Sequence, residues 1–209
     1  MKQAKRYHRP TLKMLLGVTT LLFCFQQDLI AQETTTDSIP FTSIPDAPEN
    51  YTPGTMVSRM VDGLGFRYRW ATEGLSENDW SYAPGNDGRT IGETMDHVYN
   101  LSNVILNSAK KQPTDFTVQK AELSIAEKRM ATLKNLETAS SLFKASTDLS
   151  AHKIIFIQSN GRFEFPFWNN LNGPIEDAVW HTGQIVVLRR VAGNPINPKV
   201  NVLAGKLND

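Results

Sequence analysis

Residues 175–190, which read IEDAVWHTGQIVVLRR, decide the fold of this chain. The stretch predicts a helix, and Asp177 and His181 lie one turn apart on the same face of it. Gln184 and Leu188 continue that stripe. Burying a carboxylate, an imidazole and an amide on an apolar helix costs several kcal/mol unless each group finds a partner. A metal ion is one partner that would satisfy the first two groups.

Three more stretches place apolar residues at helical spacing, so four helices are expected, over residues 55–73, 90–110, 123–144 and 172–191. Thr90 and Glu93 have the spacing of a capping box at the start of the second helix. Pro174 is tolerable in the first turn of the fourth helix, and Gly193 is a natural terminator. Four amphipathic helices predict an all-α fold, a four-helix bundle.

A small β insert is expected between the third and fourth helices. Two β-favouring runs within residues 153–167 flank Asn160 and Gly161, which is a strong hairpin signal. Residues 75–89 are expected to form a loop. The tail over residues 194–209 is expected to be irregular and to wrap the bundle.

Residues 1–31 have the pattern of a secretory signal peptide. A basic start precedes the apolar run 14–25, and Ala31 offers a small residue for cleavage. The run is too short to span a membrane comfortably, and an uncleaved N-terminal anchor is the rival interpretation. Residues 32–54 are expected to form a flexible linker and residues 55–209 the folded domain. We therefore expect an exported protein, periplasmic or secreted, with no stable membrane insertion after cleavage.

The cysteine and charge content exclude several classes of site. Cys24 is the only cysteine, and it lies inside the apolar run after the bulky Phe23, so simple cleavage is expected and not lipidation. The mature chain would then hold no disulfide, no cysteine nucleophile and no thiolate metal site. Removing residues 1–31 takes away five of the 22 basic and one of the 21 acidic side chains, which leaves a net charge near −3. Nothing here forms a basic stripe, so no nucleic-acid partner is expected.

Two helices are expected to contribute to one metal site. His97 on the second helix would join Asp177 and His181 on the fourth, giving two imidazoles and one carboxylate. That set suits one divalent ion such as Fe²⁺, Zn²⁺, Ni²⁺ or Mn²⁺, and it leaves a position open for a water that the ion would acidify. The alternative is structural, because a lone buried histidine is usually a hydrogen-bonded core residue. Asp177 and His181 would then bond only to each other.

Other residues carry a weaker signal. His152 is expected on a surface loop. An aromatic cluster is expected around the hairpin and the fourth helix, either as core or as the wall of a substrate cleft, from Phe163, Phe165, Phe167, Trp168 and Trp180. Arg189 and Arg190 complement the dipole of the fourth helix, and the alternative is that one of them binds an anionic ligand. The chain has no Walker loop, dinucleotide fingerprint or Gly-x-Ser-x-Gly elbow.

The motif Asp177-x-x-x-His181-x-Gly183-Gln184 resembles the last helix of DinB-like (YfiT-like) four-helix bundle proteins, whose usual pattern is His-x-x-x-His-x-Gly-Gln. The run from Arg89 to His97 is similar to the helix that carries the first ligand histidine of that family. The resemblance covers roughly residues 55–195. It implies a divalent metal, often Zn²⁺ or Ni²⁺, held by three histidines.

By this resemblance, His97 and His181 correspond to two of the family's ligand histidines. Asp177 stands where the family has the third histidine. A carboxylate in that place makes the site more anionic and harder. Some members of the family are metal-dependent hydrolases, and others transfer thiols such as mycothiol or bacillithiol. Because such thiols are cytosolic, export argues against thiol transfer.

The sequence thus predicts an exported metal-dependent hydrolase that acts on a small-molecule substrate, with Gln184 next to the ligands. The alternatives are a non-catalytic protein that binds a small ligand in the same pocket, and a thiol-S-transferase. Neither the substrate nor the metal is fixed by the sequence. A homodimer through an exposed helix face is compatible with it.

Overall fold

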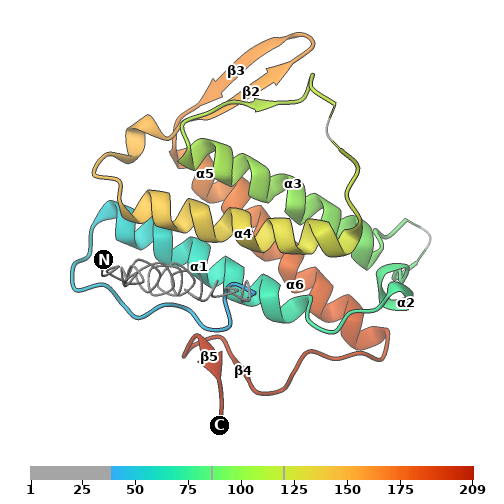
Figure 1. Cartoon of the computed structure of the whole chain (residues 1–209). Helices are drawn as coiled ribbons and strands as arrows, with labels where there is room; N and C mark the ends of the chain where they lie inside the picture. The colour runs from blue at the N-terminus through green and yellow to red at the C-terminus, as the bar shows by residue number, and fades with distance from the viewer. Residues whose placement is uncertain (1–38, 86, 120) are drawn as a thin grey trace, which may run out of the picture. The chain divides into compact units, whose positions relative to one another are not determined.

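The computed structural model describes residues 39–85, 87–119 and 121–209. Most of them lie in four long helices (Figure 1), namely α1 (Pro53–Ala71), α3 (Ile91–Ala109), α4 (Ile125–Lys144) and α6 (Glu176–Val191). Both α1 and α3 pack against α4 and α6. These bounds lie within one turn of those predicted, and the expectation of a mostly helical protein is confirmed. The expected signal peptide and Cys24 lie outside the described residues.

Side-chain caps fix where the helices begin. Thr90 Oγ1 accepts a hydrogen bond from the backbone N–H of Glu93 at 3.0 Å, and Glu93 Oε2 accepts one from the backbone N–H of Thr90 at 2.8 Å. Ser124 and Glu127 form the same reciprocal pair at the start of α4. Each box satisfies two backbone donors that the first helical turn leaves free.

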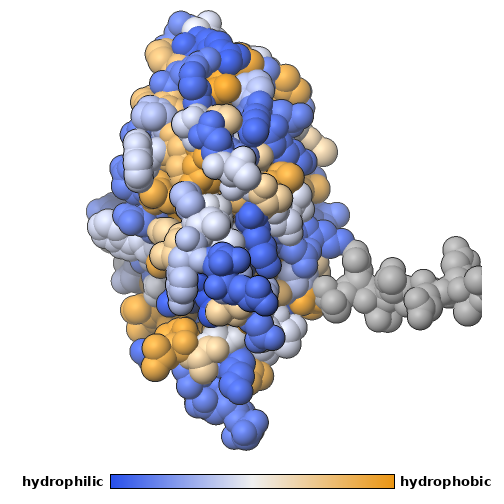
Figure 2. Space-filling model, turned by 90° about the vertical axis from the view of Figure 1, so that its left-hand side faces the viewer, coloured by the Kyte–Doolittle hydropathy of each residue, from blue (hydrophilic) through white to orange (hydrophobic). Residues whose placement is uncertain are grey.

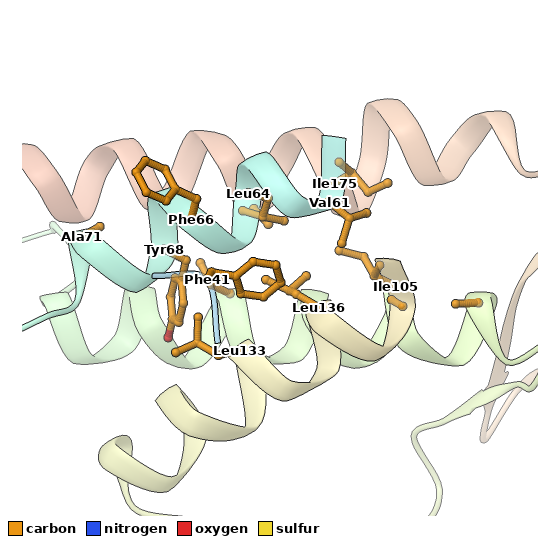
Figure 3. Packing of buried hydrophobic residues seen from close by; sticks show 14 of the residues in the cluster. Phe41, Val61, Leu64, Phe66, Tyr68, Ala71, Ile105, Leu133, Leu136 and Ile175 are labelled. Carbon is orange, nitrogen blue, oxygen red and sulfur yellow. The ribbon is translucent and has the colours of Figure 1, made fainter. Parts of the chain in front are cut away.

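The core lies between the four long helices. Figure 3 shows apolar side chains from three of them converging, among them Leu64 of α1, Ile105 of α3 and Leu136 of α4. Each of these three is fully buried. Burial of one such side chain contributes roughly 1.5–3 kcal/mol, so this contact region holds the helices in register.

The segment before α1 differs from the predicted linker from Ile39 onward. Phe41 is buried in the core cluster, and its ring fills the place where a Cβ on Gly65 would stand. Trp70 Nε1 donates to the carbonyl of Thr42 at 3.3 Å. The stretch packs on α1 because glycine leaves room there for an aromatic ring, a signal that composition alone does not carry.

The tail is less irregular than predicted. It contains the short antiparallel pair β4 (Val200–Asn201) and β5 (Lys206–Leu207). The backbone N–H of Ile44 donates to the carbonyl of Gly205 at 2.7 Å, so the segment before α1 and the tail meet.

A small sheet combines a hairpin between α4 and α6 with a short strand between α3 and α4. The strand β2 (Ile154–Gln158) pairs antiparallel with β3 (Gly161–Phe165) and parallel with β1 (Thr114–Asp115). Figure 1 shows β2 and β3 as a ribbon that extends beyond the helices. The two-residue β1 was not expected, because it is too short to show a hydrophobic period.

Short helical turns complete the fold. They are α2 (Glu77–Trp80) within the predicted loop, the 3₁₀ turn η1 (Leu149–Ala151), α5 (Trp168–Asn170) and the π-helical turn η2 (Leu171–Ile175). Gly173 has non-helical backbone angles inside η2, directly before Pro174, so the chain kinks there and α6 begins only at Glu176. Over the part of the chain that the structure describes, no helix combines the length and the apolar character needed to cross a membrane.

Candidate metal centre

The structure brings His97, Asp177 and His181 together. His97 lies in the second turn of α3, while Asp177 and His181 lie one turn apart near the start of α6, which packs against α3. One candidate ligand atom from each residue lies within 4.8 Å of the other two. Two helices from distant parts of the sequence therefore form one cluster, as the helical stripes predict.

The Asp177 carboxylate lies between the two imidazoles. Its Oδ2 is 3.2 Å from Nε2 of His97, and its Oδ1 is 3.3 Å from Nε2 of His181. The two rings meet edge to face, with centroids 4.5 Å apart and planes at 88°. Both histidines thus present the same ring nitrogen to one point beside the carboxylate.

Gln184 lies beside the second ring nitrogen of His181. Its Oε1 is 2.8 Å from Nδ1 of His181. A proton on Nδ1 would pair with this amide oxygen and would leave the lone pair of a neutral ring on Nε2, the nitrogen that lies 3.3 Å from Oδ1 of Asp177.

The contact between His97 and Asp177 has the geometry of a hydrogen bond, and His181 approaches the same carboxylate at 3.3 Å. Imidazole nitrogens and carboxylate oxygens are suitable ligands for a divalent ion, which the three residues would hold between them. The three residues therefore fit the ion that the sequence predicts.

The cluster is accessible from solvent. The side chains of His97, Asp177 and His181 are 33%, 39% and 15% exposed. The stripe was expected to be buried, whereas the structure leaves its side chains partly exposed where α3 and α6 meet. An ion or a small ligand can therefore reach the cluster without the helices separating.

A pocket of about 720 Å³ adjoins the cluster at His181. Trp180, Val187 and Leu188 of α6 form much of its apolar wall, and Gln184 and Arg89 add polar groups. Trp180 is 72% exposed, so it belongs to this wall and not to the core. The expectation of a core aromatic cluster is wrong for Trp180, for Trp168, which is 75% exposed, and for Phe163 and Phe165, which are also exposed, whereas Phe167 is buried.

The expectation that His152 lies on a surface loop is wrong. It is 3% exposed, and its ring lies near Phe143 and Phe167. Its Nδ1 is 3.2 Å from the carbonyl of Ser108, and its Nε2 is 2.9 Å from Oγ of Ser146. Burial lowers the pKa of the imidazole below its usual value. Because these partners come from other parts of the chain, no local pattern predicts this environment.

Arg189 is structural. It is 2% exposed, and it donates to the carbonyls of Trp70 and Ala71 at the end of α1 and to the carbonyl and side-chain oxygens of Asn194. These bonds satisfy helix carbonyls that have no partner of their own. The hypothesis that Arg189 binds an anionic ligand is therefore wrong, while Arg190 is exposed.

A second, more apolar pocket of about 840 Å³ lies where the start of α1 meets η1 and α5. Its lining includes the exposed side chains of Met56, Met60 and Trp168. Figure 2 looks at this side of the molecule and shows hydrophobic residues gathered in its upper middle, among hydrophilic ones. The described metal-ligating residues all lie elsewhere.

Comparison with known proteins agrees with this arrangement. The family model described as the DinB family matches residues 67–204, which is more than half of the 209 residues. No curated protein and no solved structure matches the chain. The matched region contains all three residues of the cluster as well as Gln184. The chain therefore belongs to the DinB family.

Proposed function

We propose that this protein binds one divalent metal ion through His97, Asp177 and His181 and uses it to hydrolyse a small substrate held in the adjoining pocket. The observation that carries the proposal is the convergence of two imidazole nitrogens and one carboxylate oxygen from α3 and α6, all within 4.8 Å of one another. In this proposal the four long helices are a DinB-like four-helix bundle, and the β2–β3 hairpin is an insert in it.

The donor set limits the identity of the ion. Two imidazole nitrogens and one carboxylate suit Zn²⁺, Fe²⁺, Ni²⁺ and Mn²⁺, and three protein ligands leave room for substrate. When bound, a divalent ion supplies a positive charge that acidifies water and polarises a carbonyl or phosphoryl oxygen.

The surrounding residues prepare this site. Oε1 of Gln184 lies 2.8 Å from Nδ1 of His181, so it can accept a hydrogen bond from a proton-bearing Nδ1 and leave Nε2 free to ligate. Trp180 and Val187 give the pocket an apolar wall that excludes water from one side of a bound substrate. The pocket meets the cluster at His181, so a ligand that fills it lies next to the site of the ion.

Export is part of the proposal. A basic start, the short apolar run 14–25 and Ala31 support cleavage after residue 31 and a periplasmic or secreted location. The near-neutral charge of the chain supports a small-molecule partner and argues against nucleic acid. Pairing of two copies through an exposed helix face is compatible with it.

The test uses the full chain, expressed in a bacterial host and purified without added metal or chelator, with its N-terminus read by mass spectrometry. Elemental analysis is expected to find about one equivalent of a transition metal, which His181→Ala loses. That metal is then used in a screen of small esters, amides and phosphate esters, with His181→Ala as the inactive control.

Each outcome separates the candidate functions. Metal without turnover of any compound contradicts the hydrolase and leaves a ligand-binding protein. Consumption of an electrophile only when a thiol is added identifies a thiol transferase instead. No metal in the purified protein, and no uptake of Zn²⁺, Ni²⁺, Fe²⁺ or Mn²⁺ when they are offered, contradicts the metal site itself.

A further inference from the structure

Arg89 is a cation without a partner at the edge of the pocket beside the cluster. It precedes Thr90, the N-cap of α3, and its exposed side chain lines the pocket. Among the arginines that the structure describes, only Arg89 and Arg190 make no hydrogen bond or ion pair. Of these two, only Arg89 lines the pocket.

Glu93 does not form an ion pair with Arg89. It lies one turn further along and interacts electrostatically with Arg89, but its carboxylate accepts hydrogen bonds from the backbone N–H and the hydroxyl of Thr90. Within the described residues, no acidic side chain lines the pocket. The guanidinium therefore keeps its planar set of donors free for a ligand.

The rest of the pocket favours an apolar body. Trp180 is 72% exposed and Val187 57% exposed, and Leu188 and Pro84 extend the same lining. An exposed indole and branched aliphatic groups gain most by covering an aromatic or alkyl group. The pocket thus has one unpaired cation, Arg89, beside an apolar wall.

We propose that the pocket selects small organic anions with an aromatic or branched apolar body, and that Arg89 binds the carboxylate, sulfonate or phosphate group. A guanidinium forms paired, charge-assisted hydrogen bonds with such groups. The inference rests on the proposed function for the reaction that follows, because it names the substrate class of that hydrolase. The binding step itself requires no metal.

The test compares two fluorescent probes that share an aromatic body. One is 1-anilinonaphthalene-8-sulfonate, an anion, and the other is N-phenyl-1-naphthylamine, which lacks the sulfonate. Both are titrated into the metal-free protein in EDTA, so that binding of the anion to a metal ion plays no part. Arg89→Gln is expected to weaken binding of the anion about fivefold or more and to change binding of the neutral probe less than about twofold.

Matched variants assign the effect to one residue. Arg190→Gln removes the same charge from the other unpaired arginine, outside the pocket, and is expected to leave both affinities unchanged. Trp168→Ala alters the second pocket and is expected to leave the effect of Arg89→Gln intact. Arg89→Lys keeps the charge without the planar fork, and an intermediate affinity is expected.

Several results would overturn the inference. They are an unchanged anion affinity in Arg89→Gln, equal losses for both probes, an equal loss in Arg190→Gln, and no saturable binding of either probe. A failure of the proposed function is distinct from these, because it appears as absence of metal or of turnover. In that case the fivefold difference between the probes in EDTA would remain.

Discussion

Two histidines of this protein lie in opposite kinds of environment. His152 is buried, and both of its ring nitrogens have partners that a neutral imidazole can satisfy, the carbonyl of Ser108 and the hydroxyl of Ser146. His181 is partly exposed, with the amide oxygen of Gln184 beside Nδ1 and the carboxylate of Asp177 3.3 Å from Nε2. The first histidine lies among uncharged partners of the core, whereas the second lies beside a carboxylate and a second imidazole, as a metal ligand would.

This difference gives a criterion for separating structural from functional polar groups. Burial alone does not separate them, since the more buried histidine is the structural one. What separates them is the kind of partner. The structural histidine has a carbonyl and a hydroxyl beside its ring nitrogens, whereas His181 has a carboxylate and a second imidazole beside it. Arg189 resembles His152 in this respect, because carbonyl and amide oxygens bind its guanidinium.

The largest expected effect is the loss of metal binding on removal of a ligand. His97→Ala, Asp177→Ala and His181→Ala are each expected to weaken the affinity for the resident ion by about 100-fold or more, because three ligands become two. Competition with a chromophoric chelator measures this. Glu176→Ala removes the neighbouring exposed carboxylate on α6 and should keep the wild-type affinity. Equal losses in Glu176→Ala and Asp177→Ala would refute the assignment.

The second prediction reverses the roles of the two histidines. His152→Ala is expected to lower the free energy of unfolding by about 2–4 kcal/mol, since it leaves a cavity and removes the two contacts of the ring nitrogens with Ser108 and Ser146, without changing the metal content. His181→Ala in the metal-free protein is expected to cost less than about 1 kcal/mol. Urea unfolding of both variants in EDTA provides the comparison. Larger destabilisation by His181→Ala would make its contact with Asp177 a structural pair.

The third prediction concerns the group that orients His181. Gln184→Leu removes the acceptor for Nδ1–H, so metal affinity is expected to fall about tenfold while the ligands remain. Gln184→Glu keeps an acceptor at the same position and is expected to retain or increase the affinity. The chelator competition used for the ligands measures both variants. Equal affinities in wild type and Gln184→Leu would show that Gln184 does not position the ring.

The smallest expected effect is a dependence of stability on pH. Burial holds the pKa of His152 below its ordinary value of 6.5. At a pH between 6.5 and the lowered pKa, His152 therefore binds a proton in the unfolded chain but not in the folded protein. The free energy of unfolding should therefore fall as the pH drops below 6.5, by at most about 1.4 kcal/mol per pH unit from this residue.

Urea unfolding of the metal-free protein at pH 7.5 and pH 5.5 measures that dependence. His152→Gln is the control, because it lacks the titrating group, and its loss of stability between the two values should be smaller than that of the wild type. An equal loss in both proteins would mean that His152 does not contribute.

The helices could be predicted from the sequence because their signals are local. The capping box of Thr90 and Glu93 and the apolar repeat in 90–110 place α3 within one residue of its observed ends. The packing of Phe41 against Gly65 could not be predicted, because it joins segments whose contact depends on the assembled fold. The same holds for β1, which pairs across a long stretch of chain.

The candidate site likewise has residues that the sequence predicts and residues that it does not. His97, Asp177 and His181 could be found because they lie on helix stripes that face each other. The contact of His181 with Gln184 fits the three-residue spacing, but the approach of both imidazoles to the Asp177 carboxylate appears only once the rings are placed. Arg89 carries no signal as a ligand in the sequence, since its role depends on the absence of partners and on Trp180, far along the chain.

The central claim is that both histidines and Asp177 hold one metal ion. The most direct measurement is the X-ray absorption spectrum of the protein containing its resident metal, compared with that of Asp177→His. We predict two imidazole nitrogens and oxygen ligands at about 2.0–2.2 Å, and a third imidazole in the variant. A spectrum with oxygen scattering alone, or identical imidazole scattering in the two proteins, would contradict the account.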